Sequence, residues 1–125
     1  MTNFFNLPHQ RLVAYQEARS LLACVREAAI AEPRLRDQAL RAAISACLNV
    51  AEGCGRVAPA DKARVYAIAR GEASEAGAAL DIAVAAGVCR ASAAQAGVRH
   101  AGALYGLLTG LIRRFSDRIP GRAGE

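Results

Sequence analysis

Apolar residues recur every three or four positions in four long stretches of this chain, and this spacing constrains the fold more than any other feature. The spacing is that of a helix with one buried side. No segment alternates between apolar and polar residues as a half-buried strand would. Pro and Gly separate the four stretches. The expected apolar rows are Leu12–Tyr15–Ala18–Leu22–Val25–Ala29, Leu40–Ile44–Cys47–Ala51–Cys54, Val65–Ala69–Glu72–Ala76–Ala79–Ala83 and Ala94–Val98–Ala101–Leu104–Leu108–Leu111–Phe115.

Four helices joined by short loops predict an all-α, antiparallel, up-down-up-down four-helix bundle. We expect this bundle to cover residues 8–116 and residues 117–125 to form a flexible basic tail. A chain of 125 residues fits a single domain. Hydrophobic residues make up 54% of it, but much of that is Ala and only 5% of the residues are aromatic. Because Ala buries little area, such helices often need partners from other chains, so the composition favours an oligomer.

The stretch "CLNVAEGCGR", residues 47–56, resembles a glycine-rich loop at first sight. A phosphate-binding loop needs a preceding strand, a following helix and a Lys-Ser/Thr pair, and the chain has none of these here. We therefore expect the second helix to end near Gly53. Gly53 and Gly55 are expected to cap it with a left-handed backbone conformation. Glu52 and Arg56 stand four apart and can pair on the helix surface.

Polar residues also interrupt the expected apolar rows. Asn49 lies beside small residues of the second helix, where a buried amide needs hydrogen-bond partners. Glu75 lies seven residues from both Ile68 and Ile82. If the second and third helices form a hairpin near residue 57, Glu75 comes level with Gln38 and Arg41, and a partly buried network of these three is predicted. The alternative is that Glu75 lies at the edge of the row and reaches water.

The formal charge of +5 is concentrated near the C-terminus, in "LIRRFSDRIPGR". These arginines can contact phosphates or anionic lipid, or they can form an ordinary solvated helix end. No aromatic residue is expected to form a stacking platform among them, because Tyr15, Tyr66 and Tyr105 are expected in the bundle. The predicted nucleic-acid contacts are Arg34, Arg36, Arg113, Arg114, Arg118 and Arg122.

Motifs of catalysis and metal binding are missing from the sequence. The four Cys form no CxxC pair, no His stands at zinc-ligand spacing from them, and no Glu-x-x-His pair is present. We expect no enzyme activity, metal or cofactor. The start "MTNFFNLPHQR" lacks the features of a signal peptide, and the longest uncharged run is too short for a bilayer. The sequence thus predicts a cytoplasmic protein that does not enter membranes.

Two segments together resemble the bacterial 23S rRNA intervening-sequence (S23) family of four-helix bundle proteins. "DQALRAAISACLNVAEGCGR" matches the family run Q-x-x-R-A-A-x-S-x-x-x-N-x-A-E-G-x-G-R, and Ala69, Arg70, Gly71 and Glu75 match its A-R-G-S-x-x-E. The early "RLVAYQEA" is similar to the family's opening helix. Glu72 stands where the family usually has Ser, and this second carboxylate is expected to weaken pairing at Glu75. Cys47 stands where Pro is common. The resemblance marks an assembly motif of Gln38, Arg41, Asn49, Glu52, Gly53, Gly55, Arg56 and Glu75.

The resemblance implies a homopentamer without enzymatic activity. Some members of the family are encoded within insertions of 23S rRNA genes. A related branch, the accessory protein of diversity-generating retroelements, binds nucleic acid and a reverse transcriptase. Two functions stay open: a basic scaffold for RNA, DNA or a nucleic-acid enzyme, and a structural protein-interaction module that binds no nucleic acid. A pentamer would carry about +25, so nucleic-acid binding should weaken steeply with salt.

Overall fold

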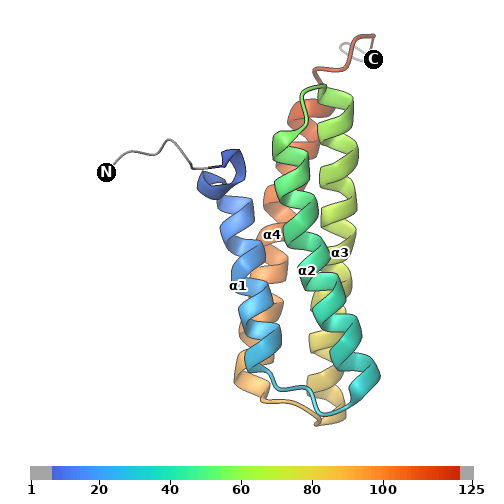
Figure 1. Cartoon of the computed structure of the whole chain (residues 1–125). Helices are drawn as coiled ribbons and strands as arrows, with labels where there is room; N and C mark the ends of the chain where they lie inside the picture. The colour runs from blue at the N-terminus through green and yellow to red at the C-terminus, as the bar shows by residue number, and fades with distance from the viewer. Residues whose placement is uncertain (1–6, 122–125) are drawn as a thin grey trace, which may run out of the picture.

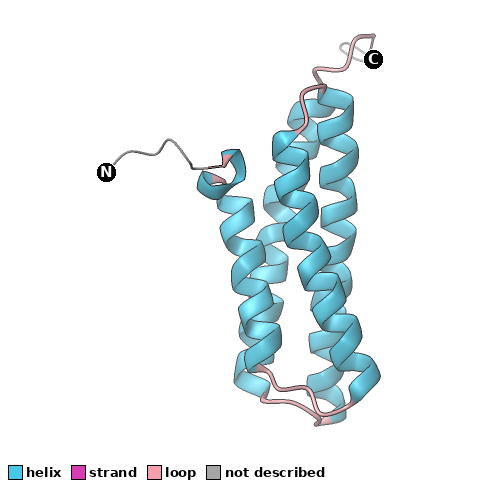
Figure 2. Ribbon diagram, in the orientation of Figure 1, coloured by secondary structure: helices cyan, strands magenta, loops and turns pink. Residues whose placement is uncertain are grey.

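The fold consists of four long helices packed against one another (Figure 1). It is seen in a computed structural model that describes residues 7–121. A short 3-10 helix, η1 (Pro8–Arg11), precedes α1 (Val13–Glu27), α2 (Pro33–Gly55), α3 (Pro59–Ala86) and α4 (Ala91–Ser116). Figure 2 shows no strand within residues 7–121. The prediction of an all-helical, four-helix fold is confirmed.

Each long helix packs mainly on two neighbours: α1 and α3 both contact α2 and α4. The α1–α2 and α3–α4 loops meet at one end of the molecule. There the Ala31 N–H donates to the Val88 carbonyl at 2.8 Å and the Arg90 N–H donates to the Ala28 carbonyl at 2.7 Å. The α2–α3 loop lies at the other end, together with η1 and the end of α4 (Figure 1).

Residues at the helix ends explain where the helices begin and stop. Pro33 and Pro59 occupy the first turns of α2 and α3, where a missing N–H costs nothing. The Glu32 carboxylate caps α2 by accepting from the Leu35 N–H at 2.7 Å. Gly87 ends α3 with φ +69°, a left-handed conformation that favours glycine. Residues 117–121, the first part of the expected tail, form turns after α4, and residues 122–125 lie outside the described range.

The core is built from many Ala residues and a few large side chains. The largest fully buried side chains are Tyr66, Leu21, Leu80, Leu104, Leu108, Val50 and Val65. Gly97 allows a close approach of helices, because a Cβ atom there would lie 2.5 Å from Leu80 Cδ1 and 3.0 Å from Cys24 Cβ. Small residues at such contacts let the helices pack tightly.

The buried side of α2 differs from the predicted row. Ile44, expected in the core, is 46% exposed, and Leu48 is 64% exposed. The buried residues of α2 are mainly small: Ala39, Ala42, Ala43, Ala46, Cys47, Val50 and Gly53. The predicted α2 core row was therefore wrong at Ile44, whereas Cys47 is buried and Leu40 packs against the core as predicted. The Ala-lined side of the helix packs inward because it permits close contact, while two large apolar side chains remain outside.

Candidate interaction surfaces

One row of polar residues runs along α2. Its members are three or four positions apart and therefore lie on one side of the helix: Gln38, Arg41, Ser45, Asn49, Glu52 and Arg56. All of these residues except Ser45 belong to the predicted assembly motif. The row follows the side of α2 that faces α3, since Arg41 reaches two carboxylates of α3.

Arg41 is the centre of a charged cluster between α2 and α3. It donates to Gln38 Oε1 at 3.1 Å, to Glu72 Oε2 at 3.1 Å and to Glu75 Oε2 at 2.6 Å. The predicted contacts among Gln38, Arg41 and Glu75 are therefore present. Glu72 also accepts from Arg41, so both carboxylates share the same guanidinium, and the effect of Glu72 on the strength of the Arg41–Glu75 pair stays a prediction. Side-chain exposure is 18% for Glu72, 37% for Glu75 and 52% for Arg41, so the cluster lies at the surface and Glu75 also reaches water.

Electrostatics of this cluster favour the charged forms. Hydrogen bonding with the Ser45 side chain, followed by contacts with Glu75 and Arg41, holds the pKa of the Glu72 carboxyl below its ordinary value, although partial burial acts in the opposite direction. The two carboxylates raise the pKa of Arg41. The cluster therefore joins α2 to α3 as an ion-paired group at neutral pH.

Asn49 finds its partners within α2. Its Nδ2 donates to the Ser45 carbonyl at 2.9 Å and lies 3.1 Å from Ser45 Oγ. The amide is half-buried rather than buried, so no cross-helix partner is required. The Asn49 side chain thus lies partly exposed at the surface of α2.

The two glycines of "CLNVAEGCGR" do not cap the helix. α2 continues through Gly55, and Arg56 ends it in an extended conformation with φ −71° and ψ 152°. The predicted left-handed caps are therefore wrong. Gly53 is instead required by the packing of α2 against α3. A Cβ atom at Gly53 would lie 2.8 Å from two ring carbons of Tyr66, whereas one at Gly55 would meet nothing within 4 Å. Gly53 therefore makes room for the buried ring of α3.

Cationic side chains instead stabilise the end of α2. Lys62 Nζ donates to the carbonyls of Cys54 at 2.8 Å and Gly53 at 3.2 Å, both in the last turn of α2, where carbonyls lack the usual helical partner. The Gly53 carbonyl also accepts from the Arg56 N–H at 3.3 Å. Arg56 pairs with Glu52, as the spacing of the two residues predicted.

Basic residues gather at the end of the molecule that holds the α2–α3 loop. We call residues 7–15, 52–66 and 109–121 the basic end. They contain seven Lys and Arg against three Asp and Glu, a net charge of +4. The basic members are Arg11, Arg56, Lys62, Arg64, Arg113, Arg114 and Arg118.

The predicted nucleic-acid residues do not all lie at the basic end. Arg113, Arg114 and Arg118 lie there. Arg34 and Arg36 begin α2 at the opposite end, separated from them by the length of α3, about 40 Å. Arg122 lies outside the described residues.

Aromatic rings accompany the basic residues, contrary to the sequence-based expectation. Phe115 has the charged groups of Arg118, Lys62 and Arg114 within 5.2–5.6 Å of its ring centroid, and it stacks on Tyr66 at 6.0 Å. Arg70 lies 5.2 Å from the ring centroid of Tyr105, which is 45% exposed. The expectation that Tyr105 lies within the bundle is therefore wrong. The contacts of Lys62 and Tyr66 with Phe115 and of Arg70 with Tyr105 join α3 to α4, so sequence spacing within one helix could not reveal them. The contacts of Arg114 and Arg118 with Phe115 are local in sequence.

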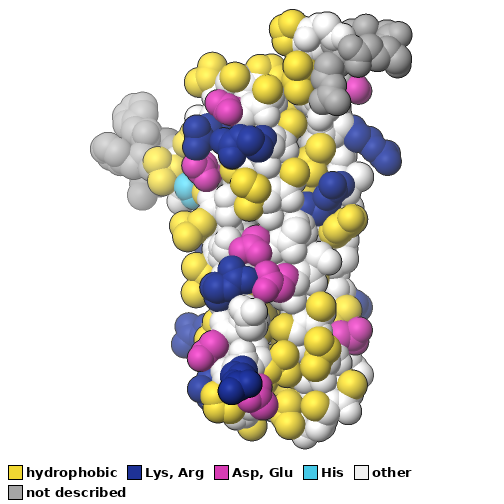
Figure 3. All heavy atoms as spheres, turned by 90° about the vertical axis from the view of Figure 1, so that its right-hand side faces the viewer, with side chains coloured by type: hydrophobic (Ala, Val, Ile, Leu, Met, Phe, Trp, Pro, Cys, Tyr) yellow, Lys and Arg dark blue, Asp and Glu magenta, His cyan; other side chains and the backbone are white. Residues whose placement is uncertain are grey.

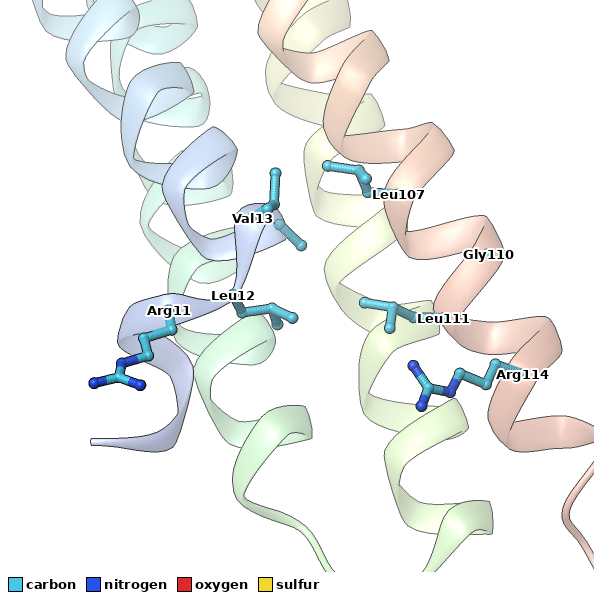
Figure 4. Close-up of a pocket in the computed structure, with 8 residues that line it drawn as sticks. Arg11, Leu12, Val13, Leu107, Gly110, Leu111 and Arg114 are labelled. Atoms are coloured by element: carbon cyan, nitrogen blue, oxygen red, sulfur yellow. The ribbon is translucent and has the colours of Figure 1, made fainter. Parts of the chain in front are cut away.

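An open groove of about 370 Å³ lies between the start of α1 and the last turns of α4 (Figure 4). Leu12, Val13, Leu107 and Leu111 line its apolar part, and Arg114 points across it. Arg11 lies at its edge and points outward (Figure 4). Val13 is 55% exposed and Leu107 is 38% exposed, so the groove adds apolar area to the surface.

A second apolar surface lies on the outer sides of α2 and α3. Ile44 and Leu48 of α2 are exposed, and so are Ile68 and Ile82 of α3, by 44% and 56%. Figure 3 shows hydrophobic side chains between charged ones on this side of the molecule. A single chain leaves these large residues in water, a pattern that marks interaction sites when several occur together.

Two further features bear on function. Within residues 7–121, no three His, Cys, Asp or Glu side chains are grouped as ligands of a metal ion would be. None of the helices described above has both the length and the apolar character needed to cross a membrane.

Comparison with known proteins identifies the family. No curated protein matches the sequence. The sequence profile described as 23S rRNA-intervening sequence protein matches residues 10–110, which include α1, α2, α3 and most of α4. The match contains the α2 polar row, Gly53 and the α3 carboxylates that bind Arg41. The chain therefore belongs to the 23S rRNA-intervening sequence protein family.

Proposed function

We propose that this protein is a non-enzymatic, basic scaffold that assembles as a homopentamer in the cytoplasm. It binds RNA or DNA, a nucleic-acid enzyme such as a reverse transcriptase, or both. The observation that carries the proposal is the basic end. Four of the five net positive charges lie there, on segments that come from all four helices.

The charges of the basic end are available to phosphates. Arg56 and Arg64 pair with Glu52 and Asp61, but no described carboxylate lies within ion-pair distance of Arg113, Arg114 or Arg118. Arg113 and Arg114 lie in the last turn of α4, where the helix dipole also favours cations. Lys and Arg that neutralise phosphates release counterions, which supplies sequence-independent affinity.

Assembly is supported by apolar surfaces on two sides of the bundle. We infer antiparallel, up-down-up-down helices, because loops of a few residues join neighbours that pack along their length. In that arrangement the α1/α4 groove and the outer α2/α3 residues lie on opposite sides. If the groove side of one chain contacts the α2/α3 side of the next, the same contact can repeat from chain to chain. It forms a closed ring when the rotation between chains closes, as a pentamer requires.

Two measurements test the proposal. Sedimentation equilibrium gives the mass of the assembly, and five times the 13.1 kDa chain is expected. Fluorescence anisotropy with a labelled structured RNA and a DNA duplex gives the affinity. We expect micromolar binding at low salt that weakens near physiological salt. A monomeric mass would contradict the assembly, and no binding at either salt would contradict the nucleic-acid function.

The α1/α4 groove favours a second candidate function. Its apolar lining and Arg114 suit a protein partner that presents apolar and acidic side chains. The protein would then be a structural interaction module without nucleic-acid affinity. A negative anisotropy result together with an intact oligomer would make this the leading account.

A further inference from the structure

Arg70 and Tyr105 form a polar and aromatic site on the α3/α4 side of the molecule. The Arg70 guanidinium carbon lies 5.2 Å from the Tyr105 ring centroid. Arg70 also donates to Thr109 Oγ1 at 3.2 Å, and Thr109 donates to the Tyr105 carbonyl at 2.8 Å. Thr109 therefore fixes the guanidinium beside the ring. Within residues 7–121, no carboxylate forms an ion pair with Arg70.

The site is open to solvent and continuous with the basic end. Tyr105 remains 45% exposed although Arg70 lies on it. Phe115 follows ten residues later in α4, about 15 Å along the helix, with Arg118 at 5.2 Å from its ring centroid. Arg113 and Arg114 lie between Tyr105 and Phe115 in the sequence, in the last turn of α4.

An exposed aromatic ring beside an arginine is the arrangement that binds unpaired bases. Bases stack on Tyr rings and on guanidinium planes, and arginines nearby contact the phosphates of the strand. In a duplex, the bases already stack on one another and are not available to such a site. The Arg70–Tyr105 pair thus adds a contact that only an unpaired nucleotide can use.

We propose that Arg70 and Tyr105 bind one unpaired base of a single-stranded nucleic acid while Arg113 and Arg118 contact its phosphates. This inference rests on the proposed nucleic-acid function and goes further, because it names unpaired strands as the preferred ligand. It also assigns a role to Arg70, a residue of the family motif that makes no contact with the Arg41 cluster.

The test compares two labelled probes, a short unstructured oligo(U) and a hairpin duplex, by anisotropy. Tyr105→Leu should weaken oligo(U) binding by about 5- to 150-fold, the usual effect of losing one stacked base, and leave duplex binding unchanged. Tyr105→Phe should keep the oligo(U) affinity, because the ring face remains. Thr109→Val removes the acceptor that holds Arg70 and should weaken only oligo(U) binding. Arg113→Ala should weaken both probes and reduce their salt dependence.

Intrinsic fluorescence gives an independent readout. The chain contains three Tyr and no Trp, so quenching of tyrosine emission by a stacked base is observable. Oligo(U) should quench the wild-type protein, and Tyr105→Phe should bind oligo(U) with the quenching lost. Thermal unfolding and sedimentation of each variant confirm that fold and assembly are intact.

Each outcome decides between the two proposals. If Tyr105→Leu binds oligo(U) as the wild type does, or weakens both probes equally, the stacking site is wrong. If the wild type binds the duplex but not oligo(U), this inference fails and the proposed function stands. If the wild type binds neither probe, both fail.

Discussion

Gly53, the first glycine of "AEGCGR", is required by the packing of α2 against the Tyr66 ring. The Tyr66 ring of α3 lies directly against the α2 backbone there, and no side chain fits between them. Burial also raises the pKa of Tyr66 to about 12. The glycine therefore serves the contact between α2 and α3, and the turn that follows does not depend on it.

Gly53→Ala should destabilise the protein by about 1–3 kcal/mol, because the added methyl group would lie 2.8 Å from the Tyr66 ring. Gly55→Ala is the matched control. It meets no atom within 4 Å and should leave stability unchanged or raise it by up to about 1 kcal/mol. Urea unfolding measures both. Equal effects of the two changes would contradict this account of Gly53.

The Glu72 carboxyl predicts a pH dependence of stability. Its pKa is lowered in the folded protein, so its stabilising contribution is complete above the ordinary value of 4.5 and is lost as the pH falls below that value. Glu72→Gln should therefore lower the free energy of unfolding at pH 7, and its difference from the wild type should shrink toward pH 3. A difference that stays constant across this range would exclude the ion-paired cluster as its cause.

At the scale of the helices, Lys62 of α3 stabilises the last carbonyls of α2. Lys62→Met should destabilise the protein by about 1 kcal/mol, because it removes two hydrogen bonds and a cation at a helix C-terminus. Arg64→Met provides the control, since its pair with Asp61 is exposed and 3.7 Å long. Chemical denaturation should show a clear loss for the first variant and little change for the second.

Periodicity predicted the helices well but placed the core side of α2 incorrectly. Pro33, Pro59 and Gly87 are local signals, so the starts of α2 and α3 and the end of α3 could be read from the sequence, whereas the end of α2 at Arg56 could not. The buried side of α2 depends on how closely two helices approach. In an Ala-rich helix, either the side with Ala residues or the side with Ile44 and Leu48 could face the core. The spacing of apolar residues within one helix does not show which side is buried.

The candidate sites divide in the same way. The contact of Arg41 with Glu75 followed from the register of the α2–α3 hairpin, which sequence spacing can predict. The contacts of Lys62 and Tyr66 with Phe115, and of Arg70 with Tyr105, join helices distant in sequence. They depend on how α3 and α4 rotate against each other, and the sequence gives no direct signal of that rotation.

At the scale of the whole molecule, a single chain leaves large apolar residues exposed on two sides. If the chain forms the proposed pentamer, Leu48→Glu should dissociate it without unfolding the protomer, because Leu48 is already 64% exposed. Val57→Glu is the control. Val57 is 93% exposed in the α2–α3 loop and should tolerate the charge. Sedimentation should report a smaller mass for the first variant alone, and an unchanged mass would place the interface elsewhere.

The claim that the basic end contacts nucleic acid is tested most directly by the salt dependence of binding. The measurement is the slope of log affinity against log salt for a DNA duplex. It is compared for the wild type, an Arg113→Ala/Arg114→Ala/Arg118→Ala variant and an Arg34→Ala/Arg36→Ala variant at the opposite end. We predict a steep wild-type slope that the first variant reduces strongly and the second leaves nearly unchanged. Equal slopes for all three proteins would contradict the assignment of the basic end.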